Sequence, residues 1–144
     1  MDTGTLLTGL RPLVIQKYSE FAQACKKAGY NIQIICGYRS PEEQTRLYNQ
    51  GRTTPGPIVT NAKAGQSMHQ TKIAFDIAIT KIIAKRSDWN KIGAIGKSLG
   101  FTWGGDFTTI LDLDHFELLL GYTEPQIMKG KVDWSKWEVP PFKA

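Results

Sequence analysis

One acidic residue inside an apolar run limits what this chain can fold into more than any other feature. The run is Ile73-Ala74-Phe75-Asp76-Ile77-Ala78-Ile79, and its β-branched and aromatic side chains predict a buried strand. An isolated buried charge is very costly, so the Asp76 carboxylate must be paired, hydrogen-bonded or bound to a metal. His69 lies seven residues before Asp76, in a segment that we also predict to be strand-like.

The second of the two histidines lies in a similar setting. His115 belongs to residues 110–118, which we predict as a strand, with Asp112 close by. Two imidazoles and a carboxylate match a zinc site that keeps one position open. Asp112 and His115 would face opposite sides of a regular strand, so they can share a site only if the strand ends, bends or bulges there. Histidines that merely pack in the core are the competing interpretation, and the HExxH signature of helical zinc proteases is missing.

Length and charge narrow the function classes. The 144 residues predict one domain with a core of its own. The net charge of +5 and the pI near 9.3 favour anionic partners, which include nucleic acid, membrane head groups and acidic wall polymers. No run of five basic residues occurs, which argues against a dedicated nucleic-acid arm. Neither Cys25 nor Cys36 belongs to a CxxC pair, so we expect two buried free thiols.

The predicted elements alternate between helices and strands. We expect helices from Pro12 to Gly29, from Pro41 to about Gln50 and from a Ser87 cap to Gly100, with strands at 31–36, 74–79 and 110–118. Ser40 and Glu43 form a predicted capping box for the second helix. Residues 51–66 are predicted to form a loop long enough to be functional. The GxSxG at 96–100 ends a helix, so we reject it as a nucleophile elbow.

Five ordered motifs within residues 10–120 resemble the M15 family of zinc peptidases. The first is Ser67-x-His69 followed by Ala74-x-Asp76, with Lys72 where the family has glycine. The second is Asp112-x-x-His115-Phe116-Glu117, with Asp114 where the family has proline. The other three are Gly37-Tyr38-Arg39-Ser40, Pro57-Ile58-Val59-Thr60-Asn61-Ala62 and Trp103-Gly104-Gly105-Asp106-Phe107. The family includes D-alanyl-D-alanine carboxypeptidases and dipeptidases, and the L-alanyl-D-glutamate peptidases found among phage endolysins.

The resemblance implies a fold and a set of site residues. The fold is α+β, with helices packed on one face of a small antiparallel sheet and zinc at the sheet's edge. Asp112 would be the general base, and Arg39 would hold a developing negative charge or a substrate carboxylate. The remaining assignments are His69, Asp76 and His115 as zinc ligands, Ser67 and Trp103 as substrate contacts, and Glu117 as the partner that orients a ligating histidine.

The predicted function is zinc-dependent cleavage of the L-Ala–D-Glu bond in peptidoglycan stem peptides by an endolysin. A D-Ala-D-Ala carboxypeptidase or dipeptidase and a non-catalytic, zinc-containing wall-binding module are the alternatives. We expect a monomeric single domain over residues 1–144, with 122–144 as a tail that wraps it, and no nucleic-acid partner. The first residues do not resemble a signal peptide, and no stretch is long enough to span a membrane. We therefore expect cytoplasmic synthesis, release by another agent, and action on an anionic bacterial envelope.

Overall fold

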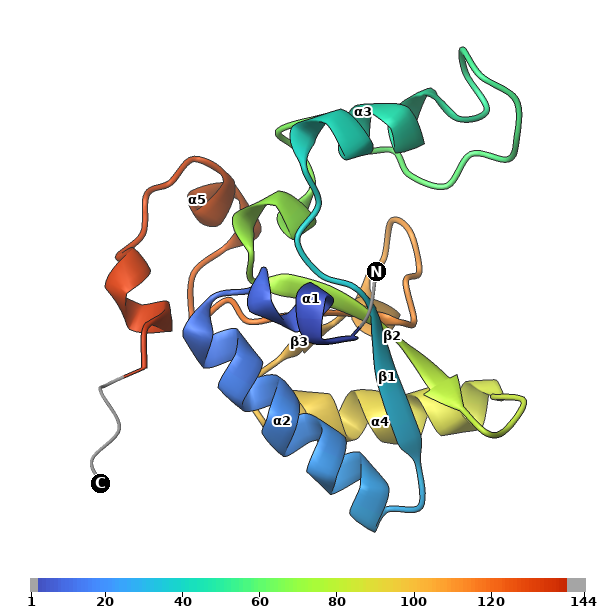
Figure 1. The fold of residues 1–144 in the computed structure, drawn as a ribbon, viewed down its shortest axis with the longest axis vertical. Coiled ribbons are helices and arrows are strands. Elements are labelled where there is room, and N and C mark those ends of the chain that lie inside the picture. Colours follow the sequence, from blue (N-terminus) through green and yellow to red (C-terminus); the bar gives the residue numbers. More distant parts are fainter. Residues whose placement is uncertain (1–2, 140–144) are drawn as a thin grey trace.

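The computed structural model describes residues 3–139 and contains a four-stranded antiparallel sheet with the order β1-β2-β4-β3 (Figure 1). The strands are β1 (Asn31–Cys36), β2 (Ala74–Thr80), β3 (Thr102–Trp103) and β4 (His115–Glu117). Each neighbouring pair runs antiparallel. The expected α+β class, with a small antiparallel sheet and helices, is confirmed.

The helices separate into a packing layer and a projecting part. The α-helices are α1 (Thr3–Thr8), α2 (Pro12–Lys27), α3 (Pro41–Asn49), α4 (Arg86–Ser98) and α5 (Glu124–Met128). Three short 3-10 helices are η1 (Met68–Thr71), η2 (Gly104–Asp106) and η3 (Trp134–Trp137). Helices α2 and α4 contact each other and the sheet. Helix α3 and the loop after it project beyond the end of β1, away from α2 and α4 (Figure 1).

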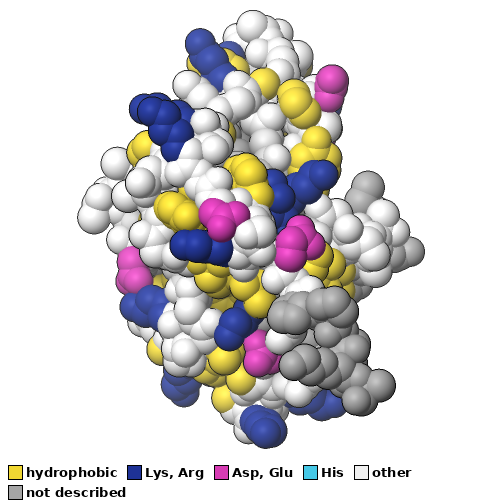
Figure 2. Space-filling view, turned by 90° about the vertical axis from the view of Figure 1, so that its left-hand side faces the viewer, with side chains coloured by type: hydrophobic (Ala, Val, Ile, Leu, Met, Phe, Trp, Pro, Cys, Tyr) yellow, Lys and Arg dark blue, Asp and Glu magenta, His cyan; other side chains and the backbone are white. Residues whose placement is uncertain are grey.

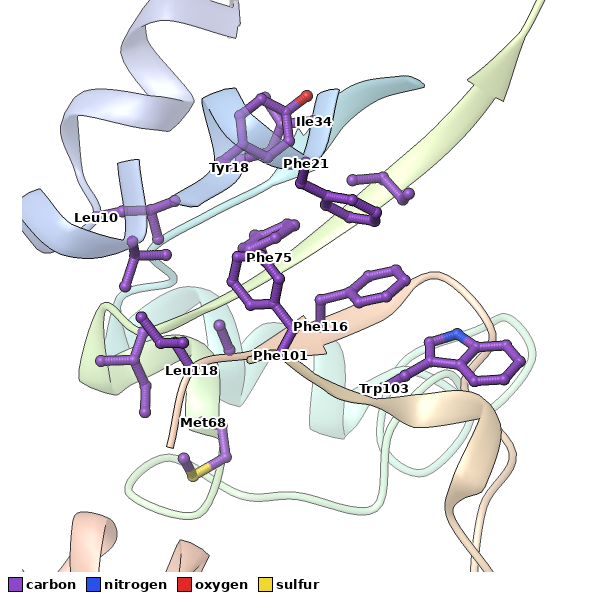
Figure 3. Close-up of a cluster of buried hydrophobic side chains, with 14 of the residues drawn as sticks. Leu10, Tyr18, Phe21, Ile34, Met68, Phe75, Phe101, Trp103, Phe116 and Leu118 are labelled. Carbon is purple, nitrogen blue, oxygen red and sulfur yellow. The ribbon is translucent and has the colours of Figure 1, made fainter. Parts of the chain in front are cut away.

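The core between this layer and the sheet is built on four phenylalanines (Figure 3). Phe21 of α2 lies 4.8 Å, centroid to centroid, from Phe116 of β4 and 5.6 Å from Phe101. Phe75 of β2 meets Phe101 edge-on at 5.2 Å. Burying an aromatic side chain contributes roughly 1.5–3 kcal/mol. This cluster therefore holds β2 and β4, the two central strands, firmly against α2.

Most element boundaries follow the predicted signals, and a few do not. Pro12 begins α2, and Gly29 follows the helix with a φ of 92°. Ser40 caps α3 by accepting a hydrogen bond from the Glu43 amide, but the Glu43 carboxylate pairs with Arg46, so the reciprocal half of the box is not made. The Ser87 cap is wrong, because α4 already begins at Arg86. The carboxylate of Asp88 accepts from the amide of residue 85 at that end instead.

The C-terminal segment packs onto the domain as far as it is described. Trp137 is fully buried, and its indole nitrogen donates to the Leu118 carbonyl at 2.8 Å. The Trp134 ring lies against the guanidinium of Arg11, 3.9 Å from ring centroid to Cζ. Part of the predicted wrapping tail, residues 140–144, lies outside the described residues.

Charged side chains are dispersed over one face of the molecule. On the face shown in Figure 2, Lys and Arg side chains occur over the whole height, with Asp and Glu among them. Basic groups spread in this way favour a general attraction to anionic surfaces over one binding groove. Within residues 3–139, no helix combines the length and the apolar character needed to cross a bilayer.

Candidate metal centre

The register of the sheet brings the central acid to its neighbours. Asp76 of β2 pairs with His115 on β4 and with Cys36 at the end of β1. Phe75 and Ile77, which flank Asp76, are buried, and successive side chains of a strand point to opposite faces. The Asp76 carboxylate therefore projects from the face opposite the phenylalanine core. Because β2 and β4 are the inner strands, the expectation of a site at the sheet's edge is wrong.

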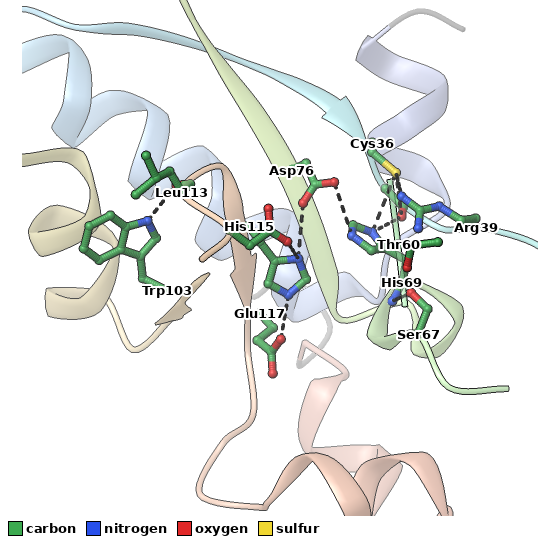
Figure 4. Close-up of polar contacts among 12 residues, drawn as sticks. Cys36, Arg39, Thr60, Ser67, His69, Asp76, Trp103, Leu113, His115 and Glu117 are labelled. Carbon is green, nitrogen blue, oxygen red and sulfur yellow. Dashed lines mark hydrogen bonds and ion pairs between the residues drawn. The ribbon is translucent and has the colours of Figure 1, made fainter. Parts of the chain in front are cut away.

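Asp76 connects the two histidines (Figure 4). One carboxylate oxygen, Oδ2, lies 3.3 Å from Nε2 of His69, and the other, Oδ1, lies 3.2 Å from Nδ1 of His115. The two imidazole rings lie 5.1 Å apart at their centroids. All three side chains are largely withdrawn from solvent, with exposures of 6%, 16% and 7% for His69, Asp76 and His115. Asp76 thus lies between two imidazoles, and all three side chains are of the types that zinc prefers.

In each imidazole, the nitrogen that does not face Asp76 has an acceptor of its own. Nδ1 of His69 lies 3.0 Å from the Gly37 carbonyl. Nε2 of His115 lies 2.6 Å from Oε1 of the fully buried Glu117. A histidine whose ring N–H donates a hydrogen bond to such an acceptor keeps its other nitrogen free to bind a metal. His69 Nε2 and His115 Nδ1 thus lie on either side of the Asp76 carboxylate as candidate metal ligands, and Glu117 lies where the sequence predicted a histidine partner.

The charges of this group also favour a cation. Burial lowers the pKa of both imidazoles, but the hydrogen bonds and charge of Asp76, together with Cys36 at His69 and Glu117 at His115, outweigh it and raise the pKa to about 9 for His69 and about 10 for His115. Burial would raise the pKa of Asp76, yet its bonds to the two histidines hold that pKa below its ordinary value. Two protons therefore occupy the group at neutral pH without a metal. A divalent cation can replace them charge for charge.

We expected His69 in a strand, but it lies in the 3-10 helix η1, which precedes β2. Ser67 caps this helix, and its hydroxyl accepts from the His69 amide at 3.3 Å. Lys72 ends it in the left-handed conformation, with a φ of 66°. Glycine adopts that conformation most readily, which explains why the family pattern has glycine there. Ser67 thus orients His69 through the backbone and also lines the cavity described below.

Asp112 reaches the group because the strand around His115 is shorter than predicted. Only His115–Glu117 is a strand, and a turn precedes it in which the His115 amide donates to the Asp112 carbonyl at 3.2 Å. The Asp112 carboxylate lies 3.9 Å from Nδ1 of His115. Asp76, Asp112 and His115 have ligand atoms within 4.8 Å of one another. The turn bends the chain between Asp112 and His115, as their odd spacing required, and both side chains therefore face one site.

Trp103 does not reach the site, so its expected contact with substrate is wrong. It is 5% exposed, and its indole nitrogen donates to the Leu113 carbonyl at 2.7 Å. It lines neither part of the cavity. Its role is to tie β3 to the segment that leads into β4. The following Gly104 lies so close to the Asp112 carbonyl that a Cβ there would be 2.1 Å from it.

Arg39 is held by two side chains that the sequence analysis did not assign to the site. Its Nη1 donates to Oε1 of Gln44 at 2.8 Å, and its Nη2 donates to Sγ of Cys36 at 3.3 Å. The Cys36 sulfur also lies 3.7 Å from Nδ1 of His69. Burial opposes ionisation of the thiol, but the hydrogen bond and charge of His69 outweigh it and lower the Cys36 pKa.

The two cysteines therefore differ. Both are free, as expected. Cys25 is buried in the core, where desolvation raises its pKa to about 12, whereas Cys36 is only partly buried. The position of Cys36 at the end of a strand, three residues before Arg39, was the one available signal for a place in the site.

A two-lobed cavity runs over the centre. The inner lobe, about 370 Å³, contains Arg39, His69, Asp76 and His115 in its wall. The outer lobe, about 700 Å³, is lined by residues of the 59–66 and 106–112 loops. Val59, Thr60, Ala62, Gln66, Phe107, Asp112 and Glu124 line both lobes, so the lobes form one trough. Among all the residues that line the two lobes, Arg39 is the one lysine or arginine.

Two further acids in this wall escaped the sequence analysis. Asp114 and Glu124 both line the inner lobe. Burial, and a hydrogen bond to the neighbouring carboxyl of Asp112, raise the pKa of Asp114 to about 7. Burial and a hydrogen bond to the carboxyl of Glu117 raise the pKa of Glu124 to about 7 as well. Glu124 comes from α5, seven residues after the last motif and outside it, so no local signal marked it.

The chain is similar in sequence to known peptidases. The family model VanY, described as D-alanyl-D-alanine carboxypeptidase, matches residues 8–108. The peptidoglycan L-alanyl-D-glutamate endopeptidase CwlK of Bacillus subtilis is 37% identical over 123 residues, which cover 76% of this chain and 74% of CwlK.

Solved structures share the fold. The L-Ala D-Glu endopeptidase ChiX of Serratia marcescens superposes with a TM-score of 0.62 at 18% identity, over 81% of this chain and 85% of ChiX. A vancomycin-resistance D,D-pentapeptidase VanY, crystallised in complex with Zn(II), gives 0.60 at 17% identity, over 86% of this chain and 80% of that one.

Proposed function

Because this chain belongs to the M15 family of zinc peptidases, through its match to the VanY model, we propose that it is an endopeptidase that cleaves the L-Ala–D-Glu bond of peptidoglycan stem peptides. The family membership predicted from five motifs is confirmed, and so is the broader class of peptidoglycan peptidase. The 37% identity to CwlK carries the choice of bond. The proposed cofactor is zinc, held by His69, Asp76 and His115.

The trough supports an endopeptidase. In both L-Ala–D-Glu and D-Ala–D-Ala, the residue after the scissile amide carries a free carboxylate, because D-Glu continues through its γ-carboxyl group. Arg39 can recognise that carboxylate in either substrate. An endopeptidase also needs room for the peptide to continue, and the outer lobe of about 700 Å³ provides it. Since the matching family model is named for D-alanyl-D-alanine carboxypeptidases, release of terminal D-Ala is the second candidate activity.

The chain's own residues then have distinct tasks. Zinc bound at this centre supplies Lewis acidity, which acidifies a water and polarises a carbonyl. Asp112, at the wall shared by both lobes, takes the proton from the attacking water and delivers it to the leaving amine. Arg39 holds the substrate carboxylate or the charge that develops on the scissile carbonyl. Glu117 and the Gly37 carbonyl keep the two imidazoles in the orientation that the centre requires.

The wider setting belongs to the same proposal. The chain would act as a monomeric single domain on the bacterial wall, as an endolysin that contributes to lysis. Its net charge of +5 supports attraction to an anionic envelope, and this attraction weakens as salt screens it. Loss of turbidity by permeabilised Gram-negative cells, abolished by chelation and restored by zinc, is the expected result. A folded, zinc-loaded protein that leaves such cells intact would contradict the lytic role.

Product analysis of digested muropeptides tests the bond. We expect fragments with D-Glu as their new amino terminus, identified by mass spectrometry. Free D-Ala as the sole product would replace the endopeptidase proposal by the carboxypeptidase one.

Asp112→Asn tests whether the centre is catalytic. The variant should retain zinc and lose about 10²- to 10⁴-fold in kcat, the usual contribution of a general base. Asp106→Asn is the matched control, because Asp106 lines only the outer lobe and pairs with Lys97. Full activity of Asp112→Asn would refute the assigned mechanism.

A further inference from the structure

Gln44 is a fully buried amide next to the proposed active site. It lies in α3 with 0% of its surface exposed. A buried amide is stable only when its polar atoms find partners. Its Oε1 accepts from Nη1 of Arg39 at 2.8 Å, and its Nε2 donates to the Ala62 carbonyl at 2.6 Å and faces the Thr60 hydroxyl at 3.4 Å.

The groups that Gln44 connects belong to different segments of the chain. Arg39 follows β1, whereas Thr60 and Ala62 belong to the loop that spans residues 51–66. All three line the inner lobe, and Gln44 itself does not. One side chain behind the wall therefore links the lobe's arginine to part of the facing chain.

Both connected parts need such support. Arginine loses about 2 kcal/mol of rotamer entropy when it is held in one geometry, and the loop carries exposed apolar residues at 58 and 59. The loop's local contacts include the Thr60 hydroxyl, which accepts from the Ala62 amide at 3.1 Å. The amide of Gln44 joins this small turn to the guanidinium.

We propose that Gln44 is a positioning residue that fixes the Arg39 guanidinium and the Thr60–Ala62 wall at one spacing, so that the substrate carboxylate meets a preformed site. The proposal rests on the proposed function for the identity of the substrate. Its structural part, the coupling of guanidinium and loop, stands on the hydrogen bonds alone.

The chemistry of the amide makes the two connections separable. The bridge needs one acceptor toward Arg39 and one donor toward Ala62, and only an amide offers both at this length. Gln44→Glu keeps the acceptor for Arg39 but turns a second oxygen toward the Ala62 carbonyl. Gln44→Met keeps the volume and removes both connections.

The test compares muropeptides whose D-Glu carries a free α-carboxylate or an α-carboxamide. The wild-type enzyme should prefer the carboxylate, because Arg39 is held ready for it. Gln44→Met should lose up to about 100-fold in kcat/KM on the carboxylate form, much less on the carboxamide, with bound zinc unchanged. Gln44→Glu should retain more of the preference but show faster amide hydrogen exchange at Ala62. If Gln44 had a merely structural role, Gln44→Met would lower kcat/KM equally for both substrates.

Gln50→Met is the matched control, because Gln50 ends the same helix and donates to the Pro57 carbonyl in the same loop, but is only half-buried and makes no hydrogen bond to Arg39. It should keep the carboxylate preference. If Gln44→Met, folded, keeps the preference and the exchange rate of the wild type, the inference is wrong. If the wild type cleaves neither substrate, the proposed function fails, and hydrogen exchange at Ala62 in the two Gln44 variants still decides the positioning role.

Discussion

Replacing Gly104 with alanine tests how the glycine turn after Trp103 positions the proposed general base. The alanine Cβ would lie 2.1 Å from the Asp112 carbonyl oxygen and 3.0 Å from the Asp112 Cβ. Ordinary contact begins at 3.4 Å, so the two segments must separate by about 1.3 Å, the difference from 2.1 Å. Residues 108–111 are exposed, whereas Trp103 is held in the core. The loop that carries Asp112 will therefore be the part that moves.

The expected cost follows from this displacement. A shift of about 1 Å in a group near the reacting atoms can reduce the rate by about 10²-fold, which corresponds to about 2.7 kcal/mol in the barrier. The assay is steady-state cleavage of a muropeptide, with bound zinc measured in the same samples. Zinc should stay bound, because the added Cβ meets none of the side chains of His69, Asp76 and His115, and only the backbone bond from His115 to the Asp112 carbonyl is disturbed. The loss should appear in kcat.

Gly29→Ala is the control for a general loss of stability. Gly29 has a φ of 92° and no atom within 4 Å of a built Cβ, so alanine there introduces backbone strain of about 1–2 kcal/mol away from the site. It should lower the free energy of unfolding and leave kcat unchanged. Unchanged kcat in a folded Gly104→Ala variant would refute the idea that this turn sets the position of Asp112.

Two further perturbations address the metal centre and the tail. Zinc affinity of the chelated protein should rise with pH between about 6 and about 8, by about tenfold per pH unit for each proton displaced, because the metal-free His69 and His115 hold protons up to pKa values of about 9 and 10. Competition titrations at fixed ionic strength measure this rise. Trp137→Ala should reduce the free energy of unfolding by about 3–5 kcal/mol, measured by urea denaturation, because the buried indole and its bond to Leu118 are both lost.

Each of these outcomes can fail in a defined way. A zinc affinity independent of pH would show that the two imidazoles carry no protons to displace. Trp137→Phe keeps most of the apolar contact and should cost less than the alanine variant. Equal stability of Trp137→Ala and the wild type would show that the C-terminal segment is not part of the cooperative unit.

The immediate sequence neighbours of the acids and histidines are enough to select the candidate site residues among them. Asp76 in an apolar strand and histidines flanked by carboxylates are signals carried by neighbouring residues. The helix start at Pro12, the cap at Ser40 and the left-handed glycine after α2 are likewise local. Such features depend on a few adjacent residues, so they can be predicted from the sequence.

Residues that enter the site through distant contacts were missed or misplaced. Cys36 lies beside His69 because β1 pairs with β2 in a particular register. Glu124 reaches the cavity from α5, and Gln44 reaches Arg39 from behind the wall. Trp103 was assigned to the cavity but is buried in the core. Strand register and the direction of a helix face depend on the packing of the whole domain, which spacing along one segment does not record.

Residue types and short spacings therefore suffice to propose a donor set and to predict the family and the longer helices and strands. Folding of the whole domain is needed to place Asp76 between both imidazoles and to press Gly104 against the Asp112 backbone. It is also needed to form the trough that joins the metal centre to the outer lobe. These arrangements depend on how whole segments pack against one another, and the burial of the shared core sets that packing.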